Sequence, residues 1–270
     1  ALQAAAEVLD DYAHGVWVVE LAALSNPALV PQAVASPFGV REQPGRPLAA
    51  TLADYLQPRT VLLVLDNCEH VVAACAQLAE ALLRSCANLR ILATSREALN
   101  IPGESAWRVP SLSLPEPGRL PPVESLVQYE AVRLFVERTL AALPGFTVTD
   151  RNAPAVVQVC HQLDGIPLAI ELAAGQAKVL SVEQIATRLD DRFRLLVRGS
   201  RTALPRHQTL RAAMDWSYDL LSERERALLR RLSVFAGGFT LEAAEDICAG
   251  DGLKGADVLD LLANLVDKSL

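Results

Sequence analysis

Two short stretches of the chain place polar side chains directly after aliphatic runs. Val61 to Leu65 is a continuous aliphatic run, and Asp66 and Asn67 follow it. Arg90 to Thr94 is a second short apolar run, and Arg96 follows it within two residues. A carboxylate at the end of a buried parallel strand can hold Mg²⁺ on nucleotide phosphates, directly or through water. An arginine at the same edge can stabilise charge on a terminal phosphate.

Each of these stretches also has a plainer interpretation. Asp66-Asn67 is a turn-forming pair, and a strand can end in such a pair without any ligand. Arg96 can be a surface residue that caps the next element. One helix of suitable length separates the two runs. The two stretches together are therefore a more specific signal of a nucleotide site than either stretch alone.

A third stretch, Cys160 to Ile170, combines turn and helix signals. Gly165 can end a helix, and Pro167 suits the first turn of the next one. Ile166 precedes a proline and is therefore pushed towards an extended conformation. These residues predict a rigid corner between two helices, and turn chemistry alone explains them.

The elements that must position these residues alternate in the first part of the chain. We expect strands at Val16 to Leu24, Val61 to Leu65, Arg90 to Thr94 and, more weakly, Trp107 to Pro110. Helical spacing indicates helices at Ala4 to Tyr12, Asn26 to Phe38, Gly45 to Tyr55 and His70 to Arg84. Strands that alternate with helices predict a parallel sheet covered on both faces.

After the proline-rich stretch Leu114 to Pro122 the pattern becomes purely helical. Four helices are expected up to Leu189, and a second break lies near Gly199 to Pro205. Four short helices follow, which with the Gly237-Gly238 turn favour a winged-helix or helix-turn-helix unit. We therefore predict three domains: an incomplete α/β domain over 1–118, an all-α domain over 119–200 and a winged-helix domain over 201–270.

The order of these motifs resembles the STAND class of signalling ATPases. The stretches LVLDNCEH, ILATSRE, CHQLDGIPLAIELAA and WSYDLLSERERALLRRLSVFAGGFTLEAAE carry the resemblance over almost the whole chain. They are most similar to the bacterial branch found in LuxR-type and antibiotic-regulatory transcription factors, which is related to NB-ARC domains. The resemblance implies a P-loop NTPase-like sheet domain, a helical lid and a winged helix.

The resemblance also implies roles for individual residues. Asp66 matches the acid that holds Mg²⁺, and Arg96 matches the arginine that reads the terminal phosphate of ATP. Gly165, Pro167 and Leu168 match the Gly-x-Pro motif of the lid, whose proline packs near adenine. In such proteins the winged helix closes on ADP, and opening lets ATP-loaded molecules assemble. The implied cofactors are therefore ATP or ADP with Mg²⁺, and self-association is the implied response.

Two departures from the family pattern bear on activity. Many relatives have a second acid directly after the Mg²⁺-binding Asp, whereas this chain has Asn67, with Glu69 two residues further on. Because an amide can position water but is a poor general base, we expect any hydrolysis to be slow. The chain also contains no Gly-x-x-x-x-Gly-Lys-Ser/Thr loop. We expect the loop and its strand to precede Ala1, the strand Arg90 to Thr94 to have an open edge, and these 270 residues alone to bind ATP poorly.

Composition narrows the classes of function. The net charge of -7 argues against broad nucleic-acid binding by this region, so DNA contacts are expected from domains outside it. No apolar run is long enough for a membrane helix, and five cysteines favour reduced thiols in the cytoplasm. The alternatives to a nucleotide switch are a winged-helix interaction scaffold with a degenerate nucleotide site and, less favoured, a small-molecule kinase.

Overall fold

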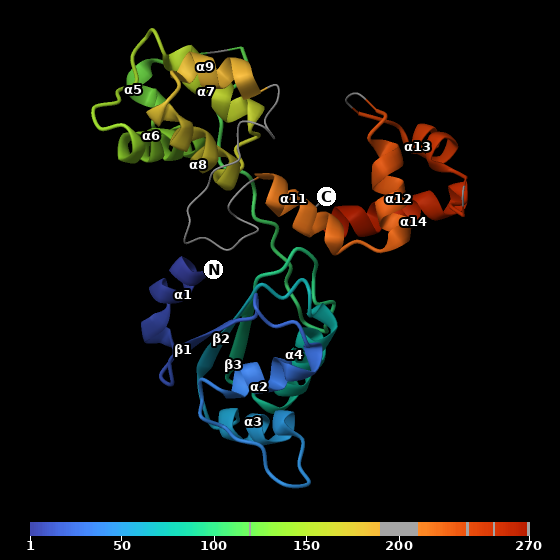
Figure 1. Ribbon diagram of the computed structural model, residues 1–270. Helices are drawn as coiled ribbons and strands as arrows, with labels where there is room; N and C mark the ends of the chain where they lie inside the picture. Colours follow the sequence, from blue (N-terminus) through green and yellow to red (C-terminus); the bar gives the residue numbers. More distant parts are fainter. Residues whose placement is uncertain (119, 190–209, 236–237, 251, 269–270) are drawn as a thin grey trace. The chain divides into compact units, whose positions relative to one another are not determined.

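The computed structural model describes residues 1–118, 120–189, 210–235, 238–250 and 252–268. The chain divides into two compact units, one made of Ala1–Trp107 with Ser222–Leu270 and the other of Arg108–Leu221. Figure 1 shows their elements, coloured along the sequence.

The first 107 residues contain a parallel sheet whose strands all end at one edge. It has three strands in the order β1 (Val16–Glu20), β2 (Val61–Asp66) and β3 (Leu89–Ala93). Glu20 lies opposite Asp66, and Leu65 lies opposite Ala93. The predicted parallel sheet is confirmed. Within the described part of the chain β3 pairs with β2 alone, so its other edge is open, as the sequence predicted.

Helices cover both faces of this sheet (Figure 1). They are α1 (Leu2–Glu7), η1 (Leu9–Asp11), η2 (Pro27–Leu29), α2 (Val30–Ala35), α3 (Leu48–Leu56) and α4 (Val72–Ser85). The larger core packs Val61, Leu63 and Leu65 against α2, α3 and α4. A smaller cluster packs Leu62 and Val64 against α1 on the opposite face. The aliphatic run of β2 is therefore buried on both sides, as in other parallel sheets.

Helix α4 forms because its apolar residues recur at helical spacing. Cys75, Leu78 and Leu82 all point into the larger core and are buried. The helix begins at Val72, two residues later than its sequence pattern indicated, because Asn67 to Val71 form a turn.

Two strand predictions need correction. Trp107 to Pro110 is not a strand, and Trp107 and Val109 are 78% and 74% exposed, so they lack the burial that an inner strand requires. β1 ends at Glu20 rather than Leu24, although Leu21 N–H still donates to Asp66 O at 3.0 Å before the chain turns.

Residues 108–221 contain helices only, among those described. These are α5 (Val123–Leu126), α6 (Glu130–Ala142), α7 (Ala153–Gln162), α8 (Pro167–Gly175), η3 (Gln176–Lys178), α9 (Val182–Arg188) and α11 (Leu210–Asp219). One core holds α6 to α9 together, with Phe135, Ile170 and Ile185 completely buried. Ser181 and Gln184 form a capping box that starts α9. The four predicted helices of this region are confirmed.

The described residues after Leu221 contain α12 (Glu223–Leu232), α13 (Leu241–Cys248) and α14 (Gly255–Asp267). An isolated antiparallel bridge joins Gly250 and Leu253 between the last two. These helices agree with the sequence pattern, whereas the winged-helix assignment and the three domain ranges stay predictions. The predicted break near Gly199 to Pro205 lies outside the described residues. Within those residues, no helix combines the length and apolarity that crossing a membrane requires.

Glu225 is a buried carboxylate that fixes the start of α12. It is 3% exposed, and Ser222 N–H and Lys268 Nζ donate to it at 2.7 and 2.8 Å. Burial raises the pKa of Glu225, but the bonds from Lys268 and Ser222 outweigh burial and hold this pKa below its usual value.

We expect Glu225→Gln to destabilise these helices by about 1–3 kcal/mol at pH 7, because Lys268 loses its charged partner. Since the pKa of Glu225 is lowered by folding, the stabilisation is present above roughly pH 4.3 and is lost as the pH falls through the lower, folded-state value. Urea unfolding of wild type and variant, measured at both ends of this range, checks the prediction. Glu223→Gln, at a carboxylate that is 80% exposed, is the control that changes stability little.

Candidate functional site

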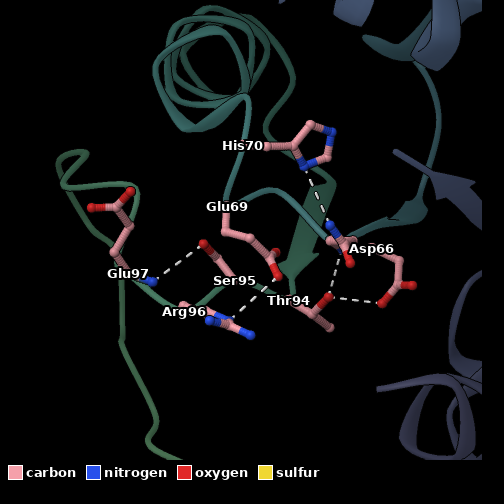
Figure 2. Close-up of polar contacts among 8 residues, drawn as sticks. Asp66, Glu69, His70, Thr94, Ser95, Arg96 and Glu97 are labelled. Carbon is pink, nitrogen blue, oxygen red and sulfur yellow. Dashed lines mark hydrogen bonds and ion pairs between the residues drawn. The ribbon is translucent and has the colours of Figure 1, made fainter. Parts of the chain in front are cut away.

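The end of β2 is fixed by side-chain hydrogen bonds to the residue that follows β3. The Thr94 hydroxyl donates to Asp66 Oδ1 at 2.7 Å and accepts from Asn67 N–H at 2.8 Å (Figure 2). Thr94 N–H donates in turn to Leu65 O at 2.9 Å. The carboxylate of Asp66 is therefore held in place at the carboxyl edge of the sheet, where parallel sheets bind ligands.

Strand alternation sets the direction in which Asp66 points. Leu62 and Val64 pack on the α1 face of the sheet, so Asp66 lies on that face too. Glu20 ends β1 in register with Asp66, and neighbouring in-register residues of a sheet share a face. A second carboxylate therefore stands beside Asp66. Glu20 is not among the residues predicted for the site, because the apolar pattern continues to Leu24 and does not mark Glu20 as the end of the strand.

The turn after Asp66 has an unusual backbone. Asn67 has φ of 69°, in the left-handed region that asparagine tolerates better than most residues. Its Nδ2 lies 3.3 Å from His70 Nδ1, and His70 Nε2 lies 3.0 Å from Leu21 O. His70 thus joins this turn to the end of β1.

Cys68, which lies between Asn67 and His70, is part of the core. Its thiol is completely buried and contacts Leu65 O at 3.6 Å. A hydrogen bond with the Cys75 thiol and burial both raise the pKa of Cys68. Metal ligation requires a thiolate, so Cys68 is suited to packing rather than to ligation.

Arg96 lies at the same end of the sheet and faces Glu69. Its Nε is 3.9 Å from Glu69 Oε1, and the two side chains are 29% and 11% exposed (Figure 2). Ser95 Oγ accepts from Glu97 N–H at 3.3 Å and so shapes the loop that carries Arg96. Of the predicted site residues, Asp66 and Asn67 are thus joined through Thr94, and Arg96 follows Thr94 by two residues at the same end of the sheet.

The other predicted site residues, Gly165, Pro167 and Leu168, lie in the Arg108–Leu221 unit. Asp164 and Gly165 have φ of 52° and 66°, and Pro167 begins α8 after the extended Ile166. Gly165 O accepts from Leu112 N–H at 3.0 Å. The predicted corner between two helices is confirmed, and the backbone at Leu112 packs against it.

Asp66 is the residue of this edge that could hold a metal ion. Mg²⁺ is commonly held by one or two carboxylates plus phosphate oxygens and water. Among the described residues, no group of three or more metal-binding side chains occurs, and Asp66 Oδ2 accepts no hydrogen bond. Thr94 holds Asp66 through Oδ1, which leaves Oδ2 as the oxygen that could contact a metal ion.

We expect Thr94→Val to destabilise the edge by about 1–3 kcal/mol, because Asp66 and Asn67 N–H each lose a hydrogen-bond partner. Thr94→Ser keeps the hydroxyl and serves as the control. Hydrogen exchange of the peptide that spans residues 61–71 measures the effect. Equal protection of this peptide in the valine and serine variants would show that the hydroxyl does not hold the edge together.

Comparisons with known proteins find relatives of the chain in mycobacteria. No protein-family model matches it. Over 256 residues, 95% of the chain, it is 46% identical to proteins of Mycobacterium tuberculosis and Mycobacterium bovis described as "Putative HTH-type transcriptional regulator". The chain is homologous to these regulators. It spans 28% of their length.

A second group of relatives matches along the whole chain. The chain is 41% identical over 270 residues to an uncharacterized protein of Mycobacterium tuberculosis, and the match covers 65% of that protein. We call Asp66, Asn67, Thr94 and Arg96 the edge cluster. It lies in a stretch of sequence that these relatives of different lengths match.

Proposed function

We propose that the chain is the ATP/ADP-dependent switch core of a bacterial signal-transduction ATPase of the STAND class, and that it works as part of a cytoplasmic transcriptional regulator. The observation that carries this proposal is the edge cluster. Asp66 is anchored by Thr94, and Arg96 follows Thr94 by two residues, at the ends of two adjacent parallel strands. The homology to HTH-type regulators supports the regulatory setting.

In this proposal Asp66 holds Mg²⁺, directly or through water. When bound, the ion neutralises charge on the outer phosphates of the nucleotide. Thr94 keeps the Asp66 carboxylate in one orientation, so little ordering remains to be done when ligand arrives. Glu20, in register on β1, adds negative charge that favours a cation at this edge.

Arg96 would read the terminal phosphate. A guanidinium offers five donors in a planar fork, and one acidic partner, Glu69, lies 3.9 Å from Arg96 Nε. The acidic partner holds Arg96 at the edge until a phosphate, which pairs well with guanidinium, competes for it. The corner of Gly165, Pro167 and Leu168 would pack near adenine, and ATP-loaded molecules would then self-associate. DNA contacts would come from domains outside this chain.

A second candidate function is a winged-helix interaction scaffold whose nucleotide site binds without hydrolysis. Asn67 favours it, because an amide cannot take a proton from water as a carboxylate does. One measurement, the release of phosphate from bound ATP, distinguishes the two functions. A switch that resets itself releases phosphate from ATP, however slowly, whereas the scaffold retains intact ATP.

The test of the proposed switch is the difference between ATP and ADP affinity in the full-length protein. We expect Arg96→Gln to weaken Mg-ATP binding about tenfold, the equivalent of about 1.4 kcal/mol, and to leave Mg-ADP binding unchanged within a factor of about two. Isothermal titration with both nucleotides measures this. Arg84→Gln, at an exposed ion pair on α4, is the control. Equal losses for ATP and ADP, or none, would remove Arg96 from phosphate recognition.

A further inference from the structure

His70 makes one hydrogen bond on each side of its ring. Nε2 lies 3.0 Å from Leu21 O, just beyond the end of β1, and Nδ1 lies 3.3 Å from Asn67 Nδ2. Leu21 N–H also donates to Asp66 O at 3.0 Å. The imidazole therefore connects the end of β1 to the turn that carries Asn67, and His70 itself lies in that turn, two residues before α4 begins (Figure 2).

The partners of the ring decide which nitrogen carries the proton. A backbone carbonyl such as Leu21 O only accepts, so Nε2 must be the N–H donor. In the neutral ring Nδ1 is then an acceptor and needs a donor opposite it. The donor is the Nδ2 end of the Asn67 amide, so the Oδ1 end of that amide is turned away from His70.

We infer that His70 is a positioning residue that fixes the orientation of the Asn67 amide, so that Asn67 presents an acceptor oxygen, rather than a donor, to water at the edge site. The inference rests on the proposed function for the identity of that water as the one that attacks the terminal phosphate. Thr94 holds the backbone N–H of Asn67, and His70 contacts its side chain. A rigid acceptor beside Asp66 orients water for attack on the terminal phosphorus. The bond to ADP breaks as the new P–O bond forms, and the proton of the water passes to an oxygen of the released phosphate rather than to Asn67.

Two variants separate the two bonds of His70. A glutamine amide reaches about as far as imidazole Nε2, so His70→Gln keeps a donor for Leu21 O and loses the acceptor for Asn67. An asparagine amide reaches about as far as Nδ1, so His70→Asn keeps the acceptor for Asn67 and loses the bond to Leu21. A role limited to anchoring Leu21 predicts that glutamine preserves function. Positioning of Asn67 predicts that asparagine preserves it.

The kinetic test uses single-turnover hydrolysis of Mg-ATP by the full-length protein. We expect His70→Gln to lower the rate of the chemical step about tenfold, with ATP affinity unchanged within a factor of about two, since one orienting hydrogen bond is lost. His70→Asn is expected to stay within about threefold of wild type. Rates that are equal in both variants, or better preserved by glutamine, would overturn the inference.

A second measurement needs no nucleotide and therefore tests the inference separately from the proposed function. Imidazole ¹⁵N NMR of the 270-residue chain, with the signal of His70 assigned by its absence in His70→Gln, reports which nitrogen is protonated. The inference requires Nε2–H and an unprotonated Nδ1 near neutral pH. A proton on Nδ1 would require Asn67 to face the ring with its oxygen, and this result would overturn the inference. If the chain shows this tautomer but the full-length protein binds no ATP, the proposed function alone is contradicted.

Discussion

Gly165→Ala is expected to destabilise the Arg108–Leu221 unit by about 2–5 kcal/mol. A Cβ at this position would lie 2.4 Å from Leu112 O and 3.3 Å from Leu112 N, and both are backbone atoms that cannot rotate away. The residue also has φ of 66°, where an L side chain costs about 1–2 kcal/mol. Forcing the two backbone segments apart adds about 1–3 kcal/mol. The bond from Leu112 N–H to Gly165 O would be lost with that movement.

Hydrogen exchange of α7 and α8 in the whole chain is the measurement that fits this prediction, because it reports on the affected helices separately from the sheet. Gly175→Ala is the matched control. Gly175 is the last residue of α8, has helical φ, and has no atom near the site of an added Cβ. Alanine there is expected to leave stability unchanged or to raise it by about 0.5–1 kcal/mol. Equal protection of α7 and α8 in the two variants would show that the corner tolerates a side chain.

Asp66→Asn is expected to weaken the binding of Mg-nucleotide by the full-length protein about 100-fold, the equivalent of about 2.7 kcal/mol. The asparagine oxygen can still accept from the Thr94 hydroxyl, so the edge keeps its geometry while the negative charge is lost. Binding measured with EDTA in place of Mg²⁺ is expected to change by no more than about twofold, because the carboxylate acts through the metal.

The control for this prediction is Asp54→Asn, at an exposed carboxylate of α3 that pairs with Arg46. This variant makes the same chemical change within the first 107 residues, but at a solvent-exposed position of α3 rather than at the end of β2. A loss of Mg²⁺-dependent affinity in both variants would point to net charge rather than to Asp66. An unchanged affinity in Asp66→Asn would exclude Asp66 as the metal ligand.

The parallel sheet and most of the helices could be predicted because burial leaves a periodic signal in the sequence. The run Val61 to Leu65 is apolar at every position, since both of its faces are covered. Helix α4 repeats Cys75, Leu78 and Leu82 at helical spacing for the same reason. The corner between two helices at Gly165 and Pro167 could also be predicted, because few residue types are compatible with the backbone there.

The contacts that shape the edge could not be predicted, because they join residues that lie far apart in sequence. The bond from Thr94 to Asp66 spans 28 positions, and the contact of His70 with Leu21 O spans 49. The resemblance supplied roles for Asp66 and Arg96, but strand register was needed to reveal Glu20 beside Asp66. The strand predicted at Trp107 was wrong for a different reason. Its local sequence pattern suits a strand, but the segment lies outside the sheet and has no partner strand there.

The most direct test of a metal-nucleotide site at this edge is to map where the metal binds. Fe²⁺ can replace Mg²⁺, and in the presence of ascorbate and peroxide it cleaves the backbone next to its own position. In the full-length protein with ATP, we expect cleavage near residues 66–70 and 94–96, and we expect it to disappear in Asp66→Asn. Cleavage elsewhere in the protein, or cleavage at these positions that persists in Asp66→Asn, would contradict the account.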